Sequence, residues 1–372
     1  MKIGILTVPF NNNYGGFLQA YALKTVIKNT GNEVIFIRRE RPRKLWWDII
    51  SIIKWLIGKG DYVFFREYKK RKASKFTDAF QHRYLYPMTE SFYRPITYQS
   101  IKKYGIDKFI VGSDQVWRYQ YAQSSIFNYF FDFLQGTNIP RMSYAASFGG
   151  NNEDFPKELF IRATKLLEEF DIITVREQQA TNILRVANNN INKSKVVLDP
   201  TFLLDKDEYV SLLSNNIKTS IPQKGLFSYL LDKDSIKTRI QTTVSEKLSI
   251  RVVEFEAMDP TLKKIEPVKS VEDWLFGIER ADFIITDSFH GTVFSIIFNR
   301  PFITIGNKQR GLERLKSVLN LFGLEDRMLL DYSEESVLTI LNTKIDWENI
   351  NKILKFNRMK SLKILIDWIQ NI

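Results

Sequence analysis

One of the two histidines in the chain stands where it could do chemistry. His290 follows an apolar stretch, 282–286, that predicts a buried strand, and it precedes a second apolar stretch that predicts a helix. An imidazole at such a junction can move a proton near neutral pH, and a helix N-terminus favours an anion. Asp287, Ser288 and Gly291 flank the histidine. We therefore expect a functional site at this turn, although a histidine beside an apolar face is more often a core residue.

Two other predicted strands also end in charged residues. Arg176 directly follows the strand expected at 171–175, and its guanidinium offers a planar fork for a carboxylate or a phosphate. A salt bridge with Glu177 or another acid is the alternative. Asp114 follows the strand expected at 108–112. It is a candidate to orient or deprotonate a hydroxyl group.

Two turns after predicted strands carry groups that suit a sugar. The first reads NNNYGGFLQ, where glycines let backbone amides approach an anion or a sugar closely. The second reads GSDQVW and brings a hydroxyl, a carboxylate, an amide and an indole together. An ordinary loop and a helix cap are the alternatives. The residues that we expect to bind a sugar are Asn13, Tyr14, Gly15, Gln19, Ser113, Gln115 and Trp117.

Apolar strands alternate with helix-patterned stretches, which favours doubly wound parallel sheets. The expected strands are 2–8, 33–37, 108–112, 141–147, 171–175, 195–199, 226–231, 250–255, 282–286 and 302–305. The pattern restarts after residue 200, so we predict an α/β protein with two Rossmann-like domains. The first domain is residues 1–200, which carry the turns that we expect to bind a sugar, and the second is residues 201–345. A C-terminal helix, 346–372, packs back on the first domain. Ligands bind such sheets beyond the carboxyl ends of the strands, where the motifs above lie.

Composition excludes several classes of site. The chain has no cysteine, which rules out disulfides, thiolate metal sites and cysteine nucleophiles, and two histidines make a histidine-rich zinc site improbable. We expect neither a metal nor a cofactor. The N-terminal sequence MKIGILTVPF predicts a strand and not a signal peptide, so we expect a cytoplasmic protein.

Much of the net charge of +12 lies in one insertion, about 38–75. This insertion has 13 lysines and arginines against 4 acidic residues. Its apolar stretch 45–57 is shorter than the roughly 20 residues that cross a bilayer, but tryptophans and basic flanks suit a helix lying on an anionic membrane. We expect contact with the inner face of the cell membrane through about 44–75. A helix buried between domains is the alternative, and the aromatic residues do not alternate with bases as on a nucleic-acid platform, so no nucleic acid is expected.

Six ordered motifs make the chain resemble the polysaccharide pyruvyl transferase family, from residue 1 to about residue 306. They are NYGGFLQAYAL, VGSDQVW, SYAASFG, TVREQ, DPTFLL and TDSFHGTVFSIIFNRPFITI. The resemblance implies a GT-B-like fold, phosphoenolpyruvate as donor, a sugar of a surface or capsular polysaccharide precursor as acceptor, and a pyruvate ketal as product. It also implies that His290 and Arg176 belong to the phosphoenolpyruvate site. Some members have Arg-Leu where Ser288-Phe289 stands here, and the possible substitutes are Arg300, Lys308 and Arg310.

Forming a ketal from phosphoenolpyruvate requires an acid, a base and cations. Our candidate catalytic residues are His290, Arg176, Asp114 and Asp287, and our candidate donor-binding residues are Arg176, Ser288, His290 and Gly291. The residues alone do not separate the acid from the base. The alternatives are a GT-B-type glycosyltransferase that uses a nucleotide sugar, and a scaffold that is inactive because of Ser288.

Overall fold

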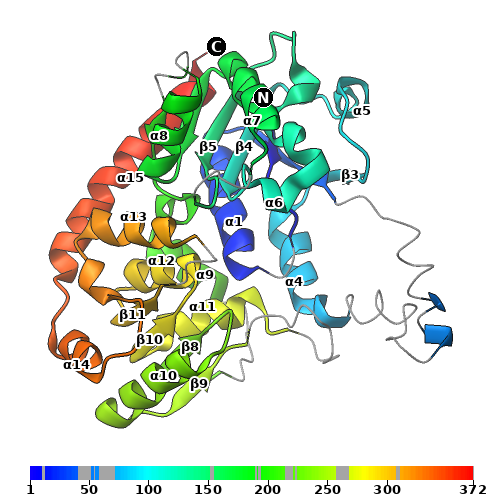
Figure 1. Ribbon diagram of the computed structural model, residues 1–372. Helices are drawn as coiled ribbons and strands as arrows, with labels where there is room; N and C mark the ends of the chain where they lie inside the picture. Colours follow the sequence, from blue (N-terminus) through cyan, green and yellow to red (C-terminus); the bar gives the residue numbers. More distant parts are fainter. Residues whose placement is uncertain are drawn as a thin grey trace.

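The structure is a computed structural model that describes residues 1–10, 13–40, 52–53, 55–57, 72–150, 155–188, 191, 194–213, 221–222, 224–256, 268–306 and 311–371. Two sheets flanked by helices lie one beyond the other, joined at their middle by α1 (Tyr14–Asn29) and α12 (Phe289–Ile297) (Figure 1). The pairings within both sheets are parallel. The prediction of an α/β fold is therefore confirmed.

The first sheet has seven strands in the order β3-β2-β1-β4-β5-β6-β7. They are β1 (Lys2–Leu6), β2 (Glu33–Arg39), β3 (Met88–Phe92), β4 (Lys108–Asp114), β5 (Arg141–Ala146), β6 (Ile172–Val175) and β7 (Lys195–Val196). Every residue of the central strand β4 is buried, as expected for a parallel sheet that is covered on both faces.

The second sheet has five strands in the order β12-β11-β10-β8-β9. They are β8 (Leu226–Tyr229), β9 (Val252–Glu254), β10 (Phe283–Thr286), β11 (Phe302–Ile305) and β12 (Met328–Leu329). The other α-helices are α4 (Lys75–Phe80), α5 (Tyr98–Lys102), α6 (Tyr119–Ala122), α7 (Lys157–Leu166), α8 (Gln178–Ala187), α9 (Lys206–Leu213), α10 (Ser235–Leu248), α11 (Val271–Arg280), α13 (Leu312–Phe322), α14 (Glu334–Asn342) and α15 (Trp347–Gln370). Short 3-10 helices lie at Gln123–Phe130, Asp132–Leu134, Leu167–Glu169, Pro200–Leu203 and Glu325–Arg327, and a π-helical turn lies at Gln81–Leu85.

The C-terminal helix α15 packs back on the first sheet, as predicted. The Lys108 ammonium, at the start of β4, donates to the carbonyl of Trp368 over 3.1 Å. The Trp368 indole N–H donates to the carboxylate of Asp171 over 3.0 Å. The end of the chain, which follows the second sheet in sequence, thus completes the outer layer of the first sheet (Figure 1).

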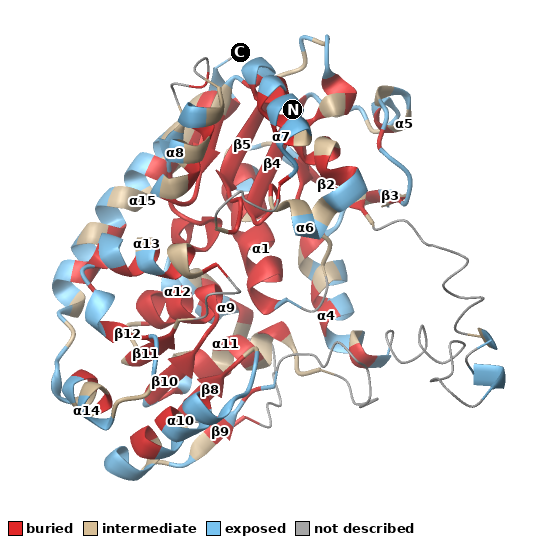
Figure 2. Cartoon of the chain, in the orientation of Figure 1, coloured by how far each residue is buried: buried red, intermediate tan, exposed pale blue. Residues whose placement is uncertain are grey.

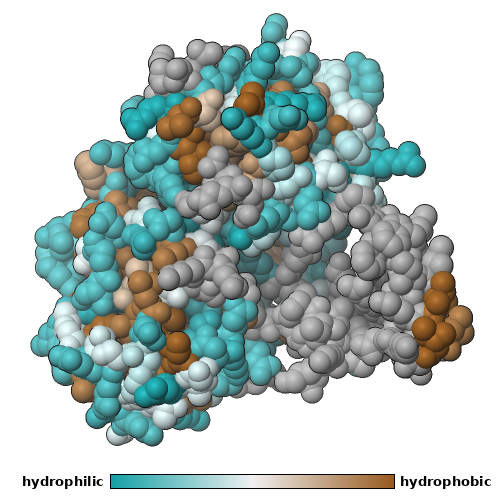
Figure 3. Space-filling view, in the orientation of Figure 1, coloured by the Kyte–Doolittle hydropathy of each residue, from teal (hydrophilic) through white to brown (hydrophobic). Residues whose placement is uncertain are grey.

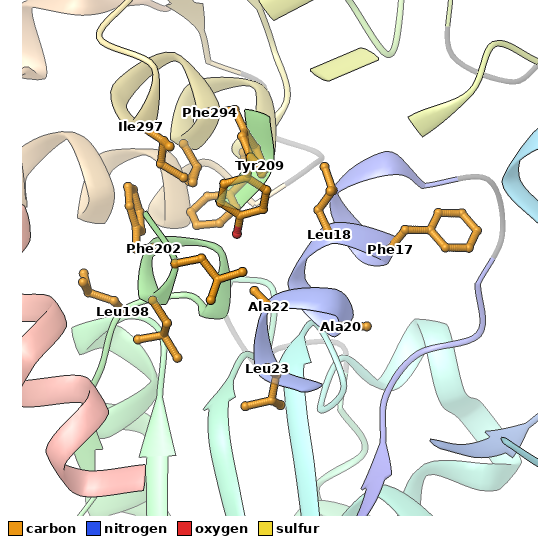
Figure 4. Packing of buried hydrophobic residues seen from close by; sticks show 14 of the residues in the cluster. Phe17, Leu18, Ala20, Ala22, Leu23, Leu198, Phe202, Tyr209, Phe294 and Ile297 are labelled. Atoms are coloured by element: carbon orange, nitrogen blue, oxygen red, sulfur yellow. The ribbon is translucent and has the colours of Figure 1, made fainter. Parts of the chain in front are cut away.

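One hydrophobic core runs through both sheets. Its largest cluster contains strands of each sheet together with α1 and α12, and both of these helices are buried along most of their length (Figure 2). The ring of Tyr14, in the first turn of α1, stacks on Trp274 of the second sheet's layer, with centroids 5.9 Å apart. Tyr209 in turn packs edge-on against Phe294 at 4.9 Å, close to Leu18 of α1 (Figure 4). Contacts that join the two halves include the Tyr14–Trp274 stack and the packing of Tyr209 against Tyr21 of α1, with centroids 6.5 Å apart. Burying one such side chain contributes about 1.5–3 kcal/mol.

Most of the insertion for which we expected membrane contact lies outside the described residues. Within its described part, Ile53 is 52% exposed and Leu56 is 69% exposed, and a brown patch marks this place at the rim of Figure 3. In the part of the chain that the structure describes, no helix is both long enough and apolar enough to cross a membrane.

Candidate functional site

Six ionisable side chains lie buried together where the two sheets meet, and we call them the charge cluster. From the first sheet, Asp114 ends β4, Arg176 and Glu177 follow β6, and Asp199 follows β7. From the second sheet, His290 lies in the first turn of α12 and Arg314 in the first turn of α13. Strand ends from both sheets thus converge, as the parallel topology requires.

Arg176 is the centre of the charge cluster. Its Nη1 lies 3.0 Å from Asp199 Oδ2, its Nη2 lies 3.5 Å from Asp114 Oδ1, and its Nε lies 3.7 Å from Glu177 Oε2. Burial alone would lower the pKa of this guanidinium, but the three carboxylates outweigh burial and raise the pKa above its ordinary value. The alternative of a salt bridge with Glu177 is therefore also correct. Neither Arg176 Nε nor Glu177 Oε2 has a hydrogen-bond partner, so both retain capacity for a ligand.

Glu177 sits in the same buried environment. Its Oε1 accepts a hydrogen bond of 2.6 Å from the Ser147 hydroxyl. Burial raises the pKa of the Glu177 carboxyl, although Arg176 and Ser147 act in the opposite direction. Glu177 can therefore hold a proton more readily than an exposed glutamate can.

Asp199 positions the histidine. One carboxylate oxygen accepts from the backbone N–H and the hydroxyl of Thr201, at 3.0 and 2.7 Å. The other accepts from the Ser113 hydroxyl at 3.1 Å and lies 3.8 Å from His290 Nε2. Burial would raise the pKa of the Asp199 carboxyl, but His290, Arg176 and the Thr201 N–H lower it well below its usual range. Asp199 therefore stays ionised beside the imidazole.

The first turn of α1 packs directly on the imidazole. A Cβ atom added to Gly15 would lie 2.1 Å from both Cγ and Nδ1 of His290. Only glycine fits here, which explains the residue that we had expected at a sugar site. Ser288 caps α12, and its Oγ accepts from the N–H of Gly291 over 3.4 Å. These contacts fix the histidine at the point where the first and second sheets touch.

Arg314 is the second guanidinium of the charge cluster, and our sequence analysis missed it. Its Nη1 lies 3.8 Å from Asp114 Oδ1, and burial, with repulsion from Arg176, lowers the pKa of Arg314 to about 10. Both guanidinium groups lie near the Phe289 ring, 4.4 Å from its centroid for Arg176 and 5.6 Å for Arg314. The available signal was its position, because Arg314 lies in the first turn of the helix after β11 just as His290 lies in the first turn of the helix after β10, but the amphipathic pattern of α13 is also that of a solvated helix.

Asp287 does not contribute to the charge cluster. Its Oδ1 accepts from the N–H of Leu231 over 2.7 Å, and its Oδ2 pairs with the Lys237 ammonium over 2.7 Å. Both oxygens are engaged within the second sheet's layer and the side chain is fully buried. The structure contradicts a catalytic role and gives Asp287 a role in anchoring the turn before His290.

Two aromatic residues that we expected at the sugar site are core residues. Trp117 is fully buried, its indole N–H donates to the Tyr129 carbonyl over 3.0 Å, and its ring stacks on Phe130 at 5.3 Å. The hydroxyl of Tyr14 donates to the Lys269 carbonyl over 3.0 Å, and its ring is likewise buried. Neither ring has a face open to a sugar, so these two predictions were wrong.

Two polar residues expected at the sugar site instead hold the turn that carries Asp114. Gln19 Oε1 accepts from the N–H of Ser113 over 3.2 Å, and Gln19 Nε2 donates to the hydroxyl of Thr7. Both Gln19 and Ser113 are fully buried. These bonds support a turn of uncommon backbone conformation, because Asp114 has a φ of 72°, in the left-handed region that only a few per cent of non-glycine residues adopt.

Arg300 is not the missing anion contact. It lies beyond the far end of α12 from His290, where its Nη2 pairs with Glu279 at 3.5 Å. Lys308 and Arg310 lie outside the described residues.

Two pockets reach the charge cluster. The Asp114 pocket, of about 200 Å³, is lined by Asp114, by the expected sugar-binding residues Asn13 and Gln115, and by Val8 and Pro9. The Arg176 pocket, of about 320 Å³, is lined by Phe289, Lys360 and four members of the charge cluster: Arg176, Glu177, Asp199 and Arg314. Among the described side chains, no group of three or more histidine, aspartate or glutamate residues is arranged to hold a metal ion.

Residues 13–309 match the family model of the polysaccharide pyruvyl transferases. No curated protein matches the chain in sequence.

Three solved structures illustrate the similarity in fold. UDP-GlcNAc 2-epimerase from Neisseria meningitidis, bound to UDP-GlcNAc, has a TM-score of 0.60 at 11% identity, covering 99% of each chain. The S. aureus MnaA–UDP complex has a TM-score of 0.53 at 13% identity, covering 100% of this chain and 98% of that one. A UGT of Glycyrrhiza uralensis in complex with glycyrrhetinic acid 3-O-monoglucuronide has a TM-score of 0.52 at 10% identity, covering 99% of this chain and 95% of that one. At these identities the likeness shows the fold alone, and it confirms the GT-B-like prediction.

Proposed function

Because this chain belongs to the polysaccharide pyruvyl transferase family, we propose that it transfers pyruvate from phosphoenolpyruvate to a sugar of a surface or capsular polysaccharide precursor, forming a pyruvate ketal. The observation that carries the proposal is the charge cluster, which places two arginines and a histidine from opposite sheets around buried carboxylates. Phosphoenolpyruvate carries a carboxylate and a phosphate, and guanidinium groups bind both.

The Arg176 pocket is the proposed donor site. Arg176, Arg314 and Lys360 line it and supply three positive charges against the two acidic side chains of Glu177 and Asp199, while Phe289 provides an apolar wall. Arg176 Nε is buried without a hydrogen-bond partner, so it has a donor to offer to the phosphate or the carboxylate. The Asp114 pocket, which contains Asn13 and Gln115, is the proposed acceptor site. The two substrates would then meet at the charge cluster from different pockets.

The proposed reaction balances without a cofactor. The methylene carbon of phosphoenolpyruvate takes a proton, C2 becomes electrophilic, and a first sugar hydroxyl bonds to C2 and loses its proton. The C2–O bond to phosphate then breaks, and a second hydroxyl bonds to C2 and loses its proton to the departing phosphate. One hydroxyl proton thus replaces the proton that the methylene carbon consumed. The net products are the ketal and hydrogen phosphate.

The residues of the charge cluster suit these steps. His290 Nε2 has no hydrogen-bond partner and lies beside the ionised Asp199, so it is the proposed acid that protonates the methylene carbon. Asp114 lines the acceptor pocket, so it is the proposed base for the sugar hydroxyl. The guanidinium groups of Arg176 and Arg314 would stabilise the charge that develops on the leaving phosphate.

Isothermal titration of phosphoenolpyruvate into the wild type, His290→Ala and Arg314→Met tests the donor site. A hydrogen bond to a charged group contributes about 1.5–3 kcal/mol, so each variant is expected to bind at least about tenfold more weakly. Arg300→Met is the matched control, because Arg300 is an arginine of the same region that pairs with Glu279 instead. UDP binding without phosphoenolpyruvate binding would overturn the proposal in favour of a nucleotide-sugar glycosyltransferase.

We also propose that the acceptor is lipid-linked and that the insertion at about 44–75 holds the enzyme at the inner face of the cell membrane. The clustered positive charge and the exposed Ile53 and Leu56 support this. Sedimentation with phosphatidylcholine vesicles, with and without phosphatidylglycerol, measures the binding. The wild type is expected to sediment with the anionic vesicles. The double variant that combines Leu56→Ser and Lys69→Glu is expected to sediment with them much less. Equal sedimentation of wild type and variant would contradict the proposal.

A further inference from the structure

Glu177 belongs to the charge cluster but has no part in the reaction steps proposed above. Its side chain is buried and lines the Arg176 pocket. Within the described part of the chain, its Oε2 has no hydrogen-bond partner. Burial of a charged oxygen without a partner is unfavourable, so this atom is suited to a proton or to a ligand that brings one.

Ser147 determines which oxygen of Glu177 can carry a proton. The Ser147 hydroxyl accepts from the N–H of Gly149 over 2.9 Å and donates to Glu177 Oε1 over 2.6 Å. A hydroxyl has a single hydrogen to donate, so Oε1 is held as an acceptor. A proton on Glu177 therefore lies on Oε2, the oxygen without a partner.

The charged groups around Glu177 act in both directions. Arg176, the preceding residue, and Arg314, from α13, favour the ionised carboxyl, whereas burial and Asp114, at the end of β4, favour the protonated one. Burial is the largest of these effects and raises the pKa of Glu177. An anionic ligand in the Arg176 pocket adds negative charge beside this carboxyl and raises its pKa further.

A ligand oxygen in the Arg176 pocket can meet both Arg176 Nε and Glu177 Oε2. These two atoms lie 3.7 Å apart, and neither has a hydrogen-bond partner among the described residues. An oxygen that accepts from Nε at about 2.7–3.2 Å can lie equally close to Oε2. Two negatively charged oxygens repel at this distance, whereas a proton on Oε2 converts the repulsion into a hydrogen bond.

We propose that Glu177 takes up a proton when the donor binds and passes it to the oxygen between C2 and phosphorus. The identity of the donor rests on the proposed function, but the uptake requires only an anion in the Arg176 pocket. As the C2–O bond breaks, its electron pair takes the proton of Glu177 and hydrogen phosphate leaves. The ionised Glu177 then accepts the proton of the second sugar hydroxyl as that oxygen bonds to C2. The hydroxyl proton is thus exchanged through Glu177, and the net products are unchanged.

Isothermal titration in buffers of different ionisation enthalpy counts the protons that bind together with a ligand. The probes are phosphoenolpyruvate and sulfate, a dianion that has no proton to exchange near neutral pH. The wild type is expected to take up roughly half a proton or more per bound anion, and Glu177→Gln is expected to lose this uptake. Glu177→Gln is expected to bind phosphoenolpyruvate within about threefold of the wild type or more tightly, because its amide donates where the protonated carboxyl would.

Glu279→Gln is the matched control, because Glu279 is a partly buried glutamate that pairs with Arg280 and Arg300 instead. Infrared difference spectra assign the proton, since a protonated carboxyl has a carbonyl stretching band that an imidazolium lacks. Proton uptake and this band in the wild type and Glu279→Gln, but not in Glu177→Gln, would support the inference. Phosphoenolpyruvate binding without uptake, or with equal uptake in Glu177→Gln, would overturn it and leave the proposed function standing. Uptake with sulfate but no binding of phosphoenolpyruvate would support it and refute the proposed reaction.

The transfer step is measured as phosphate release from phosphoenolpyruvate in the presence of lipid-extracted polysaccharide precursors. Acid–base catalysis typically contributes about 10²–10⁴-fold, so Glu177→Gln is expected to release phosphate at least about 100-fold more slowly at saturating donor, with little change in KM. Release at the wild-type rate would refute the transfer step. If the wild type releases no phosphate, the proposed reaction fails and the proton uptake alone decides the inference.

Discussion

Replacing Gly15 by alanine would bring a methyl group to within 2.1 Å of the His290 ring. The imidazole or the first turn of α1 must then shift, and forcing an extra methyl group into a packed site typically costs about 1–3 kcal/mol. Gly16, in the same turn, is the control, since the nearest atoms to a Cβ there belong to the Asn13 side chain, at 3.3–3.5 Å. Both variants gain the same helix propensity, at most about 1 kcal/mol. We expect Gly15→Ala to be less stable than Gly16→Ala by about 2 kcal/mol.

Urea unfolding measures this difference as a shift in midpoint at constant slope. A double-mutant cycle isolates its cause, because Gly15→Ala in a His290→Ala background has no ring to displace. In that background the loss of unfolding free energy caused by Gly15→Ala is expected to be about 1–2 kcal/mol smaller than in the wild type. Gly15→Ala is also expected to bind phosphoenolpyruvate more weakly than Gly16→Ala. If the two variants unfold at the same urea concentration, or if His290→Ala does not relieve the loss, the argument from close packing is wrong.

Two further predictions concern buried charges. Asp287→Asn leaves the buried Lys237 ammonium with only the more distant and exposed carboxylate of Asp234, 3.7 Å away. We expect a loss of about 3–5 kcal/mol in the free energy of urea unfolding, against less than about 1 kcal/mol for Glu254→Gln in the exposed pair with Lys233, and equal losses would contradict this. Burial lowers the pKa of Lys24 to about 8, so the folded chain releases this proton before the unfolded chain does. The wild type is therefore expected to gain stability relative to Lys24→Met as the pH rises from about 8 towards 10.5, and an unchanged difference in urea midpoint would refute this.

The strands that the sequence pattern indicates most clearly are those buried on both faces. β1, β4 and β10 are runs of apolar and β-branched residues, and their periodicity is unambiguous. β3 was not predicted, because its sequence MTESF is polar and lies at the edge of the sheet, where only Thr89 and Phe92 are buried. Its pairing with β2 depends on contacts between residues that are far apart in the sequence.

The location of the candidate site could be predicted, but the direction of its side chains could not. Strand ends place Asp114, Arg176 and His290 at one edge, and the structure brings these three together with Asp199. Sequence spacing does not show which face of a turn meets the core, and for that reason Trp117 was wrongly assigned to a sugar. Arg314 was missed because a charged residue in an amphipathic helix resembles a solvated face until its partners are known.

The contact of α1 with the second sheet's layer limits how parts of this chain can be exchanged. Tyr14 is held by Trp274, and Gly15 makes room for His290, so each half of the protein completes the other's surface. A chimera that joins one half of this chain to the complementary half of a relative would bring together surfaces that did not evolve as a pair. It would have to carry these four residues as a matched set, and a graft of the strands and loops alone would leave the histidine without its support.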